Sequence, residues 1–251
     1  MTATKADQIR ALLKSIETGD PGPIAVVDQS QYIQHNPQTH EGSEGLEALF
    51  KRLSLTQPRV NIVRAFEDGD FVFAHTEYDF SRRNIGFEVF RFENGRAVEH
   101  WDNIQKRMGP NASGRSMVDG PIEAQDLSQT EANRALVREF CETVLIAGQF
   151  ERLEDYLAGG QLIQHNPELT DGGAPLRAYL SLRAPDVVYT RLHRILAQGN
   201  FVLSVCEGRL NGEPTSFYDL YRIEEGKLAE HWDTRETVPP RSAWKNDNGK
   251  F

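Results

Sequence analysis

The sequence has 251 residues, of which 39% are hydrophobic and 26% are charged, a composition typical of a soluble globular protein rather than a disordered or fibrous one. The formal net charge of −9 and the lack of a basic cluster argue against nucleic acid and anionic membrane surfaces as partners. Two cysteines without metal-like spacing, no signal-peptide core and no long apolar run predict a reduced, cytoplasmic protein.

The first element expected is a helix near the N-terminus. Its apolar residues recur at helical spacing, and Gly19 stands where the helix should end. They are Ile9, Leu12, Leu13 and Ile16. An irregular Gln-His-Asn-Pro segment follows at 34–37, and a second short helix is expected around Leu46, Leu49 and Phe50.

From Val60 onward the apolar period changes from helical to alternating, which predicts strands. The strands are expected over 60–66, 71–78, 86–92 and 96–106, separated by turn signals at 68–70 and 93–95. Helices followed by an antiparallel meander predict an α+β fold, with the helices packed on one face of a curved sheet.

The same order of signals then recurs in the second half of the chain. The Gln-His-Asn-Pro segment returns at 164–167, and Glu-His-Trp-Asp at 99–102 returns at 230–233. The two offsets differ by one residue, as a small insertion in a turn would produce. We therefore predict a tandem duplication, with domain 1 over 1–108, a Gly- and Pro-rich linker over 109–128, and domain 2 over 129–251.

The helices of the second copy carry further signals. Ser128 and Glu131 match a capping box, and Gly148 marks the end of that first helix. Its apolar residues are Val137, Phe140, Cys141 and Val144. A second short helix is predicted around Leu176, Tyr179 and Leu180, with Pro175 at its first position.

Residues that could transfer protons lie on one predicted strand face. His100 and Asp102 are two apart and share a face, whereas Trp101 points the other way, into the core. Glu88, on the preceding strand, lies near them if the register agrees. The second copy repeats this set as His231, Asp233 and Asp219, with Trp232 as the core residue. A histidine and a carboxylate in an apolar cavity suit general acid–base catalysis, although the same residues also stabilise strand ends in many folds.

Three further positions are candidates for the site. His35 and Asn36 lie in the turn before the meander, and His165 and Asn166 are their counterparts; such a turn could direct a histidine inward or merely satisfy its own backbone. His75 shares a face with Phe73 and Glu77. Val205 occupies its place in the second copy, so ordinary packing is the simpler interpretation of His75.

The same residues could also form a metal site. His35, His100 and Asp102 would form a set of two histidines and one carboxylate, as would His165, His231 and Asp233. Their spacing matches no metal motif, and phosphate-binding glycine loops and nucleophile elbows are absent from the sequence. We expect neither a metal nor a cofactor.

The segments at 32–37, 87–95 and 99–102, which read Tyr-Ile-Gln-His-Asn-Pro, Phe-Glu-Val-Phe-Arg-Phe-Glu-Asn-Gly and Glu-His-Trp-Asp, resemble the SnoaL-like branch of the nuclear transport factor 2-like superfamily. The resemblance spans both copies. It implies two tandem cone-shaped (cystatin-like) α+β barrels, each enclosing one pocket. It also implies that the two copies pair as an internal pseudo-dimer, and that the chain could form a homo-oligomer.

The resemblance implies a cofactor-independent acid–base enzyme of the aldol cyclase, isomerase or dehydratase type, acting on a small apolar carbonyl compound. Asp102 and Asp233 would act as general base or acid, assisted by His100, His35, His231 and His165. Asn36, Glu88, His75, Asn166 and Asp219 would contact the substrate. The Asp-Arg-Asp set of epoxide hydrolases has no match in this sequence. A non-catalytic small-molecule binding protein remains the alternative.

Overall fold

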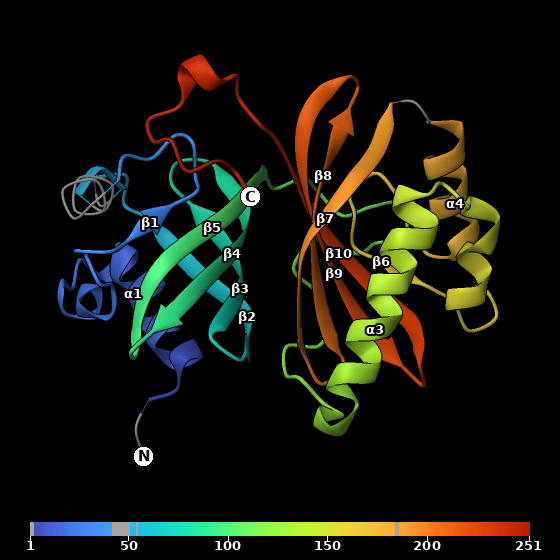
Figure 1. Ribbon diagram of the computed structural model, residues 1–251, viewed down its shortest axis with the longest axis horizontal. Helices are drawn as coiled ribbons and strands as arrows, with labels where there is room; N and C mark the ends of the chain where they lie inside the picture. Colours follow the sequence, from blue (N-terminus) through green and yellow to red (C-terminus); the bar gives the residue numbers. More distant parts are fainter. Residues whose placement is uncertain (1–2, 42–50, 54, 184–185) are drawn as a thin grey trace. The chain divides into compact units, whose positions relative to one another are not determined.

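The computed structural model describes residues 3–41, 51–53, 55–183 and 186–251, and the chain divides into two compact units (Figure 1). Unit 1 comprises Met1–Lys106 together with Val238–Phe251, and unit 2 comprises Arg107–Thr237. The C-terminal segment therefore belongs to the unit in which the chain begins.

Within the described residues, each unit contains a five-stranded sheet, and both sheets have the same strand order. Four long strands form the predicted antiparallel meander, and a short first strand pairs in parallel with the last one. Unit 1 contains β1 (Ile33–Gln34), β2 (Arg59–Asp68), β3 (Phe71–Asp79), β4 (Arg83–Glu93) and β5 (Arg96–Lys106). Unit 2 contains β6 (Ile163–Gln164), β7 (Val187–Gln198), β8 (Phe201–Leu210), β9 (Glu213–Glu224) and β10 (Lys227–Thr237).

Helix α1 (Lys5–Thr18) covers the sheet of unit 1. The Thr4 hydroxyl accepts from the Asp7 N–H and the Asp7 carboxylate accepts from the Thr4 N–H, which fixes the start of the helix. Gly19 ends it with φ 72°. The apolar face predicted from the sequence is buried and packs against β2 and β3, which confirms that prediction.

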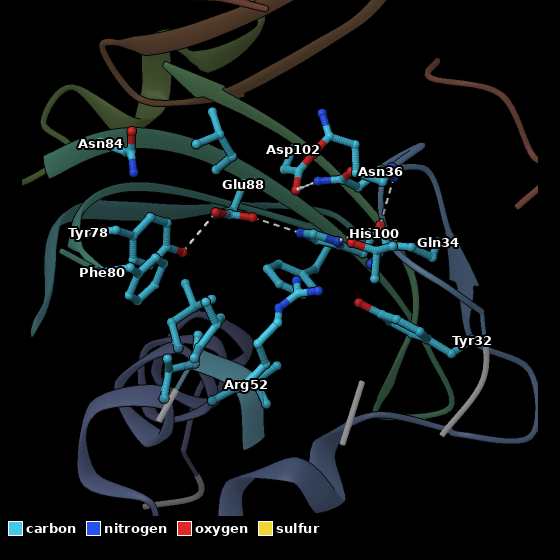
Figure 2. Close-up of a pocket in the computed structure, with 18 of the residues that line it drawn as sticks. Tyr32, Gln34, Asn36, Arg52, Tyr78, Phe80, Asn84, Glu88, His100 and Asp102 are labelled. Atoms are coloured by element: carbon cyan, nitrogen blue, oxygen red, sulfur yellow. Dashed lines mark hydrogen bonds and ion pairs between the residues drawn. The ribbon is translucent and has the colours of Figure 1, made fainter. Parts of the chain in front are cut away.

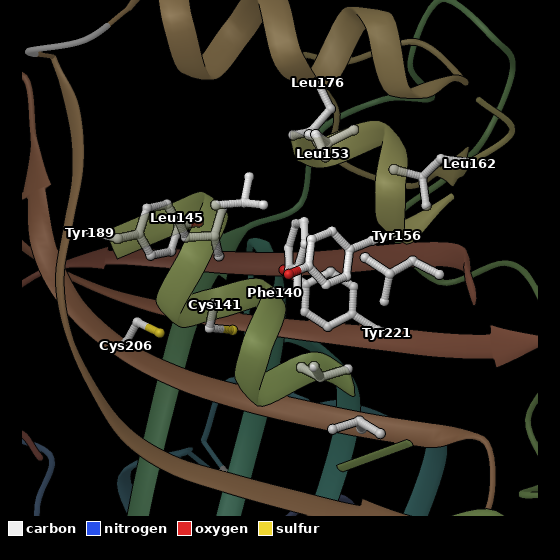
Figure 3. Packing of buried hydrophobic residues seen from close by; sticks show 14 of the residues in the cluster. Phe140, Cys141, Leu145, Leu153, Tyr156, Leu162, Leu176, Tyr189, Cys206 and Tyr221 are labelled. Atoms are coloured by element: carbon white, nitrogen blue, oxygen red, sulfur yellow. The ribbon is translucent and has the colours of Figure 1, made fainter. Parts of the chain in front are cut away.

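In unit 2 the corresponding helix is α3 (Thr130–Phe140), which continues as a π-helical turn over Cys141–Ile146. All four of its predicted apolar residues are fully buried. Figure 3 shows the core that they form, where the Phe140 ring meets the edges of Tyr156 and Tyr221 at centroid distances of 5.3 Å and 5.6 Å. Cys141 and Cys206 are both buried there and unpaired.

Some details of the predicted helices are wrong. Ser128 lies in a 3-10 turn (Leu127–Gln129), and α3 begins after Gln129 with no capping side chain, so the expected capping box does not form. Ser128 is already inside the turn that follows Asp126 (φ 53°), so it does not occupy the position before the helix that a capping residue needs. Helix α4 (Gly173–Leu182) begins before Pro175, which is tolerated within a first turn because its missing N–H would have no intrahelical partner. The helix predicted around Leu46, Leu49 and Phe50 lies outside the described residues.

Each unit is completed by a segment with the same short pattern of Asn, two residues, Gly and a cation. In unit 1 the pattern covers 246–250, and the Asn246 amide donates to the carbonyl oxygens of Asn36 (2.8 Å) and Thr39 (2.9 Å). In unit 2 it covers 111–115, and the Asn111 amide donates to the carbonyl oxygens of Gln164 (2.6 Å) and Asn166 (3.3 Å). The segment after β5 thus belongs to unit 2, and the segment after β10 belongs to unit 1.

Candidate functional site

Unit 1 contains a cavity of about 450 Å³, lined by residues of α1 on one side and of the sheet on the other (Figure 2). Its apolar lining consists of Leu12, Leu13, Ile16, Leu53, Phe80, Phe90 and Ile104. Polar groups lie along the sheet: Tyr32, Gln34, Asn36, Tyr78, Glu88, His100 and Asp102. Further polar or charged lining residues are Gln38, Thr39, Arg52, Asn84 and Lys245. The volume suits a small organic molecule with both apolar and polar parts.

The register of β4 and β5 brings the predicted carboxylate to the histidine. Glu88 is the cross-strand partner of Asp102, and its Oε2 lies 2.7 Å from Nε2 of His100. The other Glu88 oxygen accepts from the Tyr78 hydroxyl at 2.8 Å. Glu88 and His100 are both buried. The sequence could not fix the register of these two strands, and the structure shows that Glu88 lies next to His100.

The protonation of His100 follows from its other neighbour. Gln34 Oε1 accepts from the backbone N–H of Asn36 at 2.8 Å, so this atom is the amide oxygen and not the nitrogen. It lies 3.0 Å from Nδ1 of His100, which must therefore carry a proton. A single further proton then lies between Nε2 and Glu88, and the pair is neutral overall.

Asp102 is held in a different way. The Asn36 side-chain oxygen accepts from the Gln38 N–H, so the Asn36 amide nitrogen is the group that donates to Asp102 Oδ2 at 2.7 Å. Nζ of buried Lys250 donates to the Asp102 carbonyl oxygen at 2.8 Å and lies 3.4 Å from Oδ1. Two donors therefore hold Asp102 in place, one on each oxygen of its carboxyl group.

Two tyrosine hydroxyls also face the cavity. Burial, reinforced by the nearby Glu88, raises the pKa of both Tyr32 and Tyr78 well above the usual value, so both stay protonated at neutral pH. Tyr78 donates to Glu88, whereas the Tyr32 hydroxyl makes no hydrogen bond to any described residue. The Tyr32 ring stacks parallel to His100 at 6.4 Å and is 8% exposed. Tyr32 is therefore a donor that a bound molecule could use.

His35 lies outside the cavity lining. Its ring stacks on Trp101 at 4.6 Å, on the face of β5 opposite His100. Nδ1 donates to the Gly249 carbonyl oxygen (2.9 Å), and Nε2 lies 2.9 Å from the Glu99 carboxylate. The structure thus separates His35 from His100 and Asp102, and gives it the position of a residue that joins the C-terminal segment to the sheet.

His75 also lies away from the cavity, and packing is the role that its position indicates. It is fully buried beside Phe87, and its Nδ1 accepts from Arg64 at 2.8 Å. It is not among the residues that line the cavity. The turn residue Asn36, by contrast, lines the cavity and holds Asp102.

Unit 2 repeats the network around its own histidine. Gln164 Oε1 accepts from the Asn166 N–H and lies 2.9 Å from Nδ1 of His231, and Nε2 lies 3.0 Å from Asp219. Burial raises the pKa of Asp219, against the opposing effect of the His231 hydrogen bond. Asp233 accepts from the Asn166 amide at 2.7 Å.

His165 repeats the placement of His35. It stacks on Trp232 at 4.7 Å and contacts the Ser116 carbonyl oxygen and Glu230, each at 2.7 Å. Like His35, it is absent from the lining of its own unit's cavity.

The cavity of unit 2 is nearly closed, at about 20 Å³, which is room for one water molecule. Phe217 stands where unit 1 has Gly86, and Arg235 where unit 1 has Ile104. Arg235 lies 3.3 Å from the Asp233 carboxylate and donates to the Tyr179 hydroxyl at 2.5 Å. The space that a ligand would take in unit 1 is filled by side chains in unit 2.

The structure also changes which residues could form a metal site. The set considered from the sequence is separated, because His35 lies away from the other two residues. Among the described residues, Glu88, His100 and Asp102 bring one ligand atom each within 4.8 Å of one another. The hydrogen bond between His100 and Glu88 accounts for part of this proximity.

Several residues of the site were not anticipated from the sequence: Tyr32, Gln34, Tyr78 and Lys250. Gln34 recurs as Gln164 within the repeated segment, which is a usable signal. Lys250 belongs to the pattern that recurs at 111–115, which the comparison of the repeats could also have found. Tyr32 and Tyr78 are replaced by Leu162 and Gly208 in the second copy, so the repeat gave no signal for them.

Comparison with known families agrees with this geometry. Residues 9–100 match the model of the SnoaL-like domain. The match covers 92 of the 251 residues, so the chain contains a segment similar to the SnoaL-like domain. The matched segment contains most of α1 and of the sheet of unit 1, and with them the cavity residues other than Asp102, Ile104 and Lys245. A search of curated proteins finds no match.

Solved structures with the same α+β architecture each match about one unit. An NTF-2-like protein of unknown function from Burkholderia xenovorans is 19% identical and covers 47% of this chain and 97% of its own, with a TM-score of 0.39. An LEH-like epoxide hydrolase from M. tuberculosis is 19% identical and covers 43% and 85%, with a TM-score of 0.36. TsrD from Streptomyces laurentii is 20% identical and covers 41% and 91%, with a TM-score of 0.36. The α+β fold of both units follows from their own sheets and helices, and none of the described helices could cross a membrane.

Proposed function

We propose that unit 1 is a cofactor-independent acid–base catalyst of the SnoaL type, acting on a small, mostly apolar compound with an enolisable carbonyl group. The observation that carries the proposal is the pairing, in one cavity, of the Asp102 carboxyl group, held by Asn36, with a Glu88–His100 pair that shares a proton. A base and a proton store side by side are what enolate chemistry needs.

In this mechanism the Asp102 carboxylate removes a proton from the carbon next to the carbonyl group. The Tyr32 hydroxyl donates a hydrogen bond to the carbonyl oxygen as negative charge develops there. The proton shared by Glu88 and His100 can pass to the enolate oxygen, which leaves the pair with one negative charge until the proton returns. Asn36 and Lys250 position Asp102, while His35 and His165 have structural roles.

The test is proton exchange at carbon, because it needs no knowledge of the natural substrate. The protein is incubated in D2O with a panel of small ketones and 1,3-dicarbonyl compounds, and loss of the α-proton signal is followed by NMR. Asp102→Asn should slow protein-dependent exchange by at least about 100-fold, the usual contribution of a general base. Tyr32→Phe should slow it less, because it removes one hydrogen-bond donor.

The repeat supplies the matched control. Asp233→Asn alters the corresponding residue beside a closed cavity and should leave exchange unchanged. Equal exchange rates in wild type and Asp102→Asn would refute the assignment of the base. Unchanged far-UV circular dichroism in both variants would show that the fold is retained.

A non-catalytic binding protein is the second candidate, and one observation favours it. Glu88, His100 and Asp102 all have hydrogen-bond partners within the unit, as the polar groups of a passive ligand cup would. The same experiment separates the two, since a binder shows saturable ligand binding without exchange for any compound of the panel.

A further inference from the structure

Two cations line the cavity of unit 1 without partners in the part of the chain that the structure describes. Arg52 and Lys245 are both lining residues, and neither side chain makes a hydrogen bond or ion pair with a described residue. Figure 2 shows the Arg52 guanidinium extending into the cavity, with Tyr32 on one side and Tyr78 and Phe80 on the other. The Arg52 charge is thus directed at the space that a ligand would fill, and the exposed Lys245 lies in the lining of the same cavity.

The acidic residues of the cavity are already engaged. Glu88 shares a proton with His100, which makes that pair neutral, and Asp102 is balanced by Lys250. Arg52 and Lys245 therefore leave the cavity with an excess of positive charge. This excess contrasts with the formal net charge of −9 of the whole chain.

Unit 2 shows the opposite arrangement. Leu182 corresponds to Arg52, and Pro110 corresponds to Lys245 in the repeated terminal pattern. The cation of unit 2 is Arg235, which is buried and pairs with Asp233 inside the closed cavity. In the closed cavity of unit 2, Arg235 has an acidic partner, Asp233. In the open cavity of unit 1, Arg52 and Lys245 have no acidic partner among the described residues.

We infer that the cavity of unit 1 binds a ligand with an apolar body and a carboxylate group, and that Arg52 and Lys245 bind the carboxylate. A guanidinium suits this group because it can donate two parallel hydrogen bonds to its two oxygens. The apolar body would lie among the seven apolar lining residues, beside Tyr32 and Asp102. The inference rests on the proposed function only in placing the reactive carbon there, and the binding itself stands without it.

The test uses two probes of the same shape and different charge, 2-naphthylacetate and 2-naphthylacetamide, with dissociation constants measured by calorimetry on the full-length protein. The acetate should bind at least about tenfold more tightly than the amide, since a charge-assisted hydrogen bond replaces a neutral one. Arg52→Gln should weaken acetate binding by at least about tenfold and change amide binding by less than about twofold. Lys245→Gln should have a smaller effect of the same kind.

Arg177→Gln is the control, because Arg177 is an exposed arginine in α4 of unit 2. It should leave both affinities unchanged. Equal affinity for the two probes, unchanged acetate binding in Arg52→Gln, or no acetate binding at millimolar concentration would each overturn the inference. Discrimination between the probes together with exchange that Asp102→Asn does not slow would refute the proposed function alone.

Discussion

At the scale of single residues, the site depends on the amide oxygen of Gln34, a residue that the repeat marks without showing what it does. Gln34 Oε1 accepts from the Asn36 backbone and from His100 at once, which fixes the imidazole proton on Nδ1. The sequence predicted that His100 and Asp102 share a face, because alternation along a strand is a local property. It could not predict the role of Gln34, since that depends on the parallel pairing of the two-residue strand β1 with β5.

Gly86 offers a residue-scale prediction. A Cβ at this position would lie 2.6 Å from Thr76 Oγ1, 2.7 Å from the Tyr78 ring and 2.8 Å from Glu88 Oε1. Gly86→Ala should therefore displace Tyr78 from Glu88 and lower the free energy of unfolding by about 1–3 kcal/mol, the usual effect of overpacking. Urea unfolding followed by circular dichroism measures it.

The control for this change is Gly109→Ala, because a Cβ there meets no atom within 4 Å. Its stability should differ from wild type by no more than about 0.5 kcal/mol. A Gly86→Ala variant as stable as Gly109→Ala would show that Tyr78 and Glu88 adapt without strain, and that their contact is not tightly packed.

At the scale of elements, what could be predicted followed from periodicity. The helix at Lys5–Thr18 matches its expected pattern because it buries one continuous face. The strand at Arg96–Lys106 matches because its side chains alternate between two sides of the sheet, both largely buried. The terminal segment over 238–251 has no periodicity, and several of its hydrogen bonds run from side-chain amides to backbone carbonyl oxygens of unit 1. Its contribution to the site could therefore only be found in three dimensions.

Lys250 lets this contribution be measured. Lys250→Met should lower the free energy of unfolding by about 2–4 kcal/mol, because it leaves the buried Asp102 carboxylate without its cation. Adding Asp102→Asn to the same chain should recover part of the loss, since the uncompensated charge disappears. Urea unfolding of the two single variants and the double variant gives the coupling energy.

Arg115 is the matched control, since it occupies the place of Lys250 in the repeated pattern of unit 2. It pairs instead with Asp171 at 3.3 Å, and both side chains are about a third or more exposed, at 43% and 33%. Arg115→Met should therefore change stability by less than about 1 kcal/mol. Equal losses for Arg115→Met and Lys250→Met would mean that burial of the Lys250–Asp102 pair has no energetic consequence.

At the scale of the whole molecule, a repeated network has been kept in two units whose cavities differ in volume by a large factor. The repeat itself was readable because the Gln-His-Asn-Pro and Glu-His-Trp-Asp segments are collinear in both copies. The difference between the cavities was not, because it arises from exchanges of volume between neighbouring strands. Unit 1 has the large Tyr78 on one strand and Gly86 on the next. Unit 2 has the reverse, with Gly208 on one strand and Phe217 on the next, and the Phe217 ring fills the space.

Arg235 shows how unit 2 tolerates its retained carboxylate. Arg235→Ile, which places the Ile104 side chain of unit 1 at this position, would leave the Asp233 carboxylate buried without its cation. We expect a loss of about 3–5 kcal/mol in the free energy of unfolding, measured by urea denaturation. In the double variant Arg235→Ile with Asp233→Asn most of this loss should disappear, because a neutral amide can remain beside the Asn166 side chain.

Naphthylacetate binding should stay at one molecule per chain in all of these variants, since the bound site is in unit 1. A second binding site in the double variant would instead show that Arg235 alone keeps the cavity of unit 2 closed, and that Phe217 and Tyr189 do not fill it by themselves.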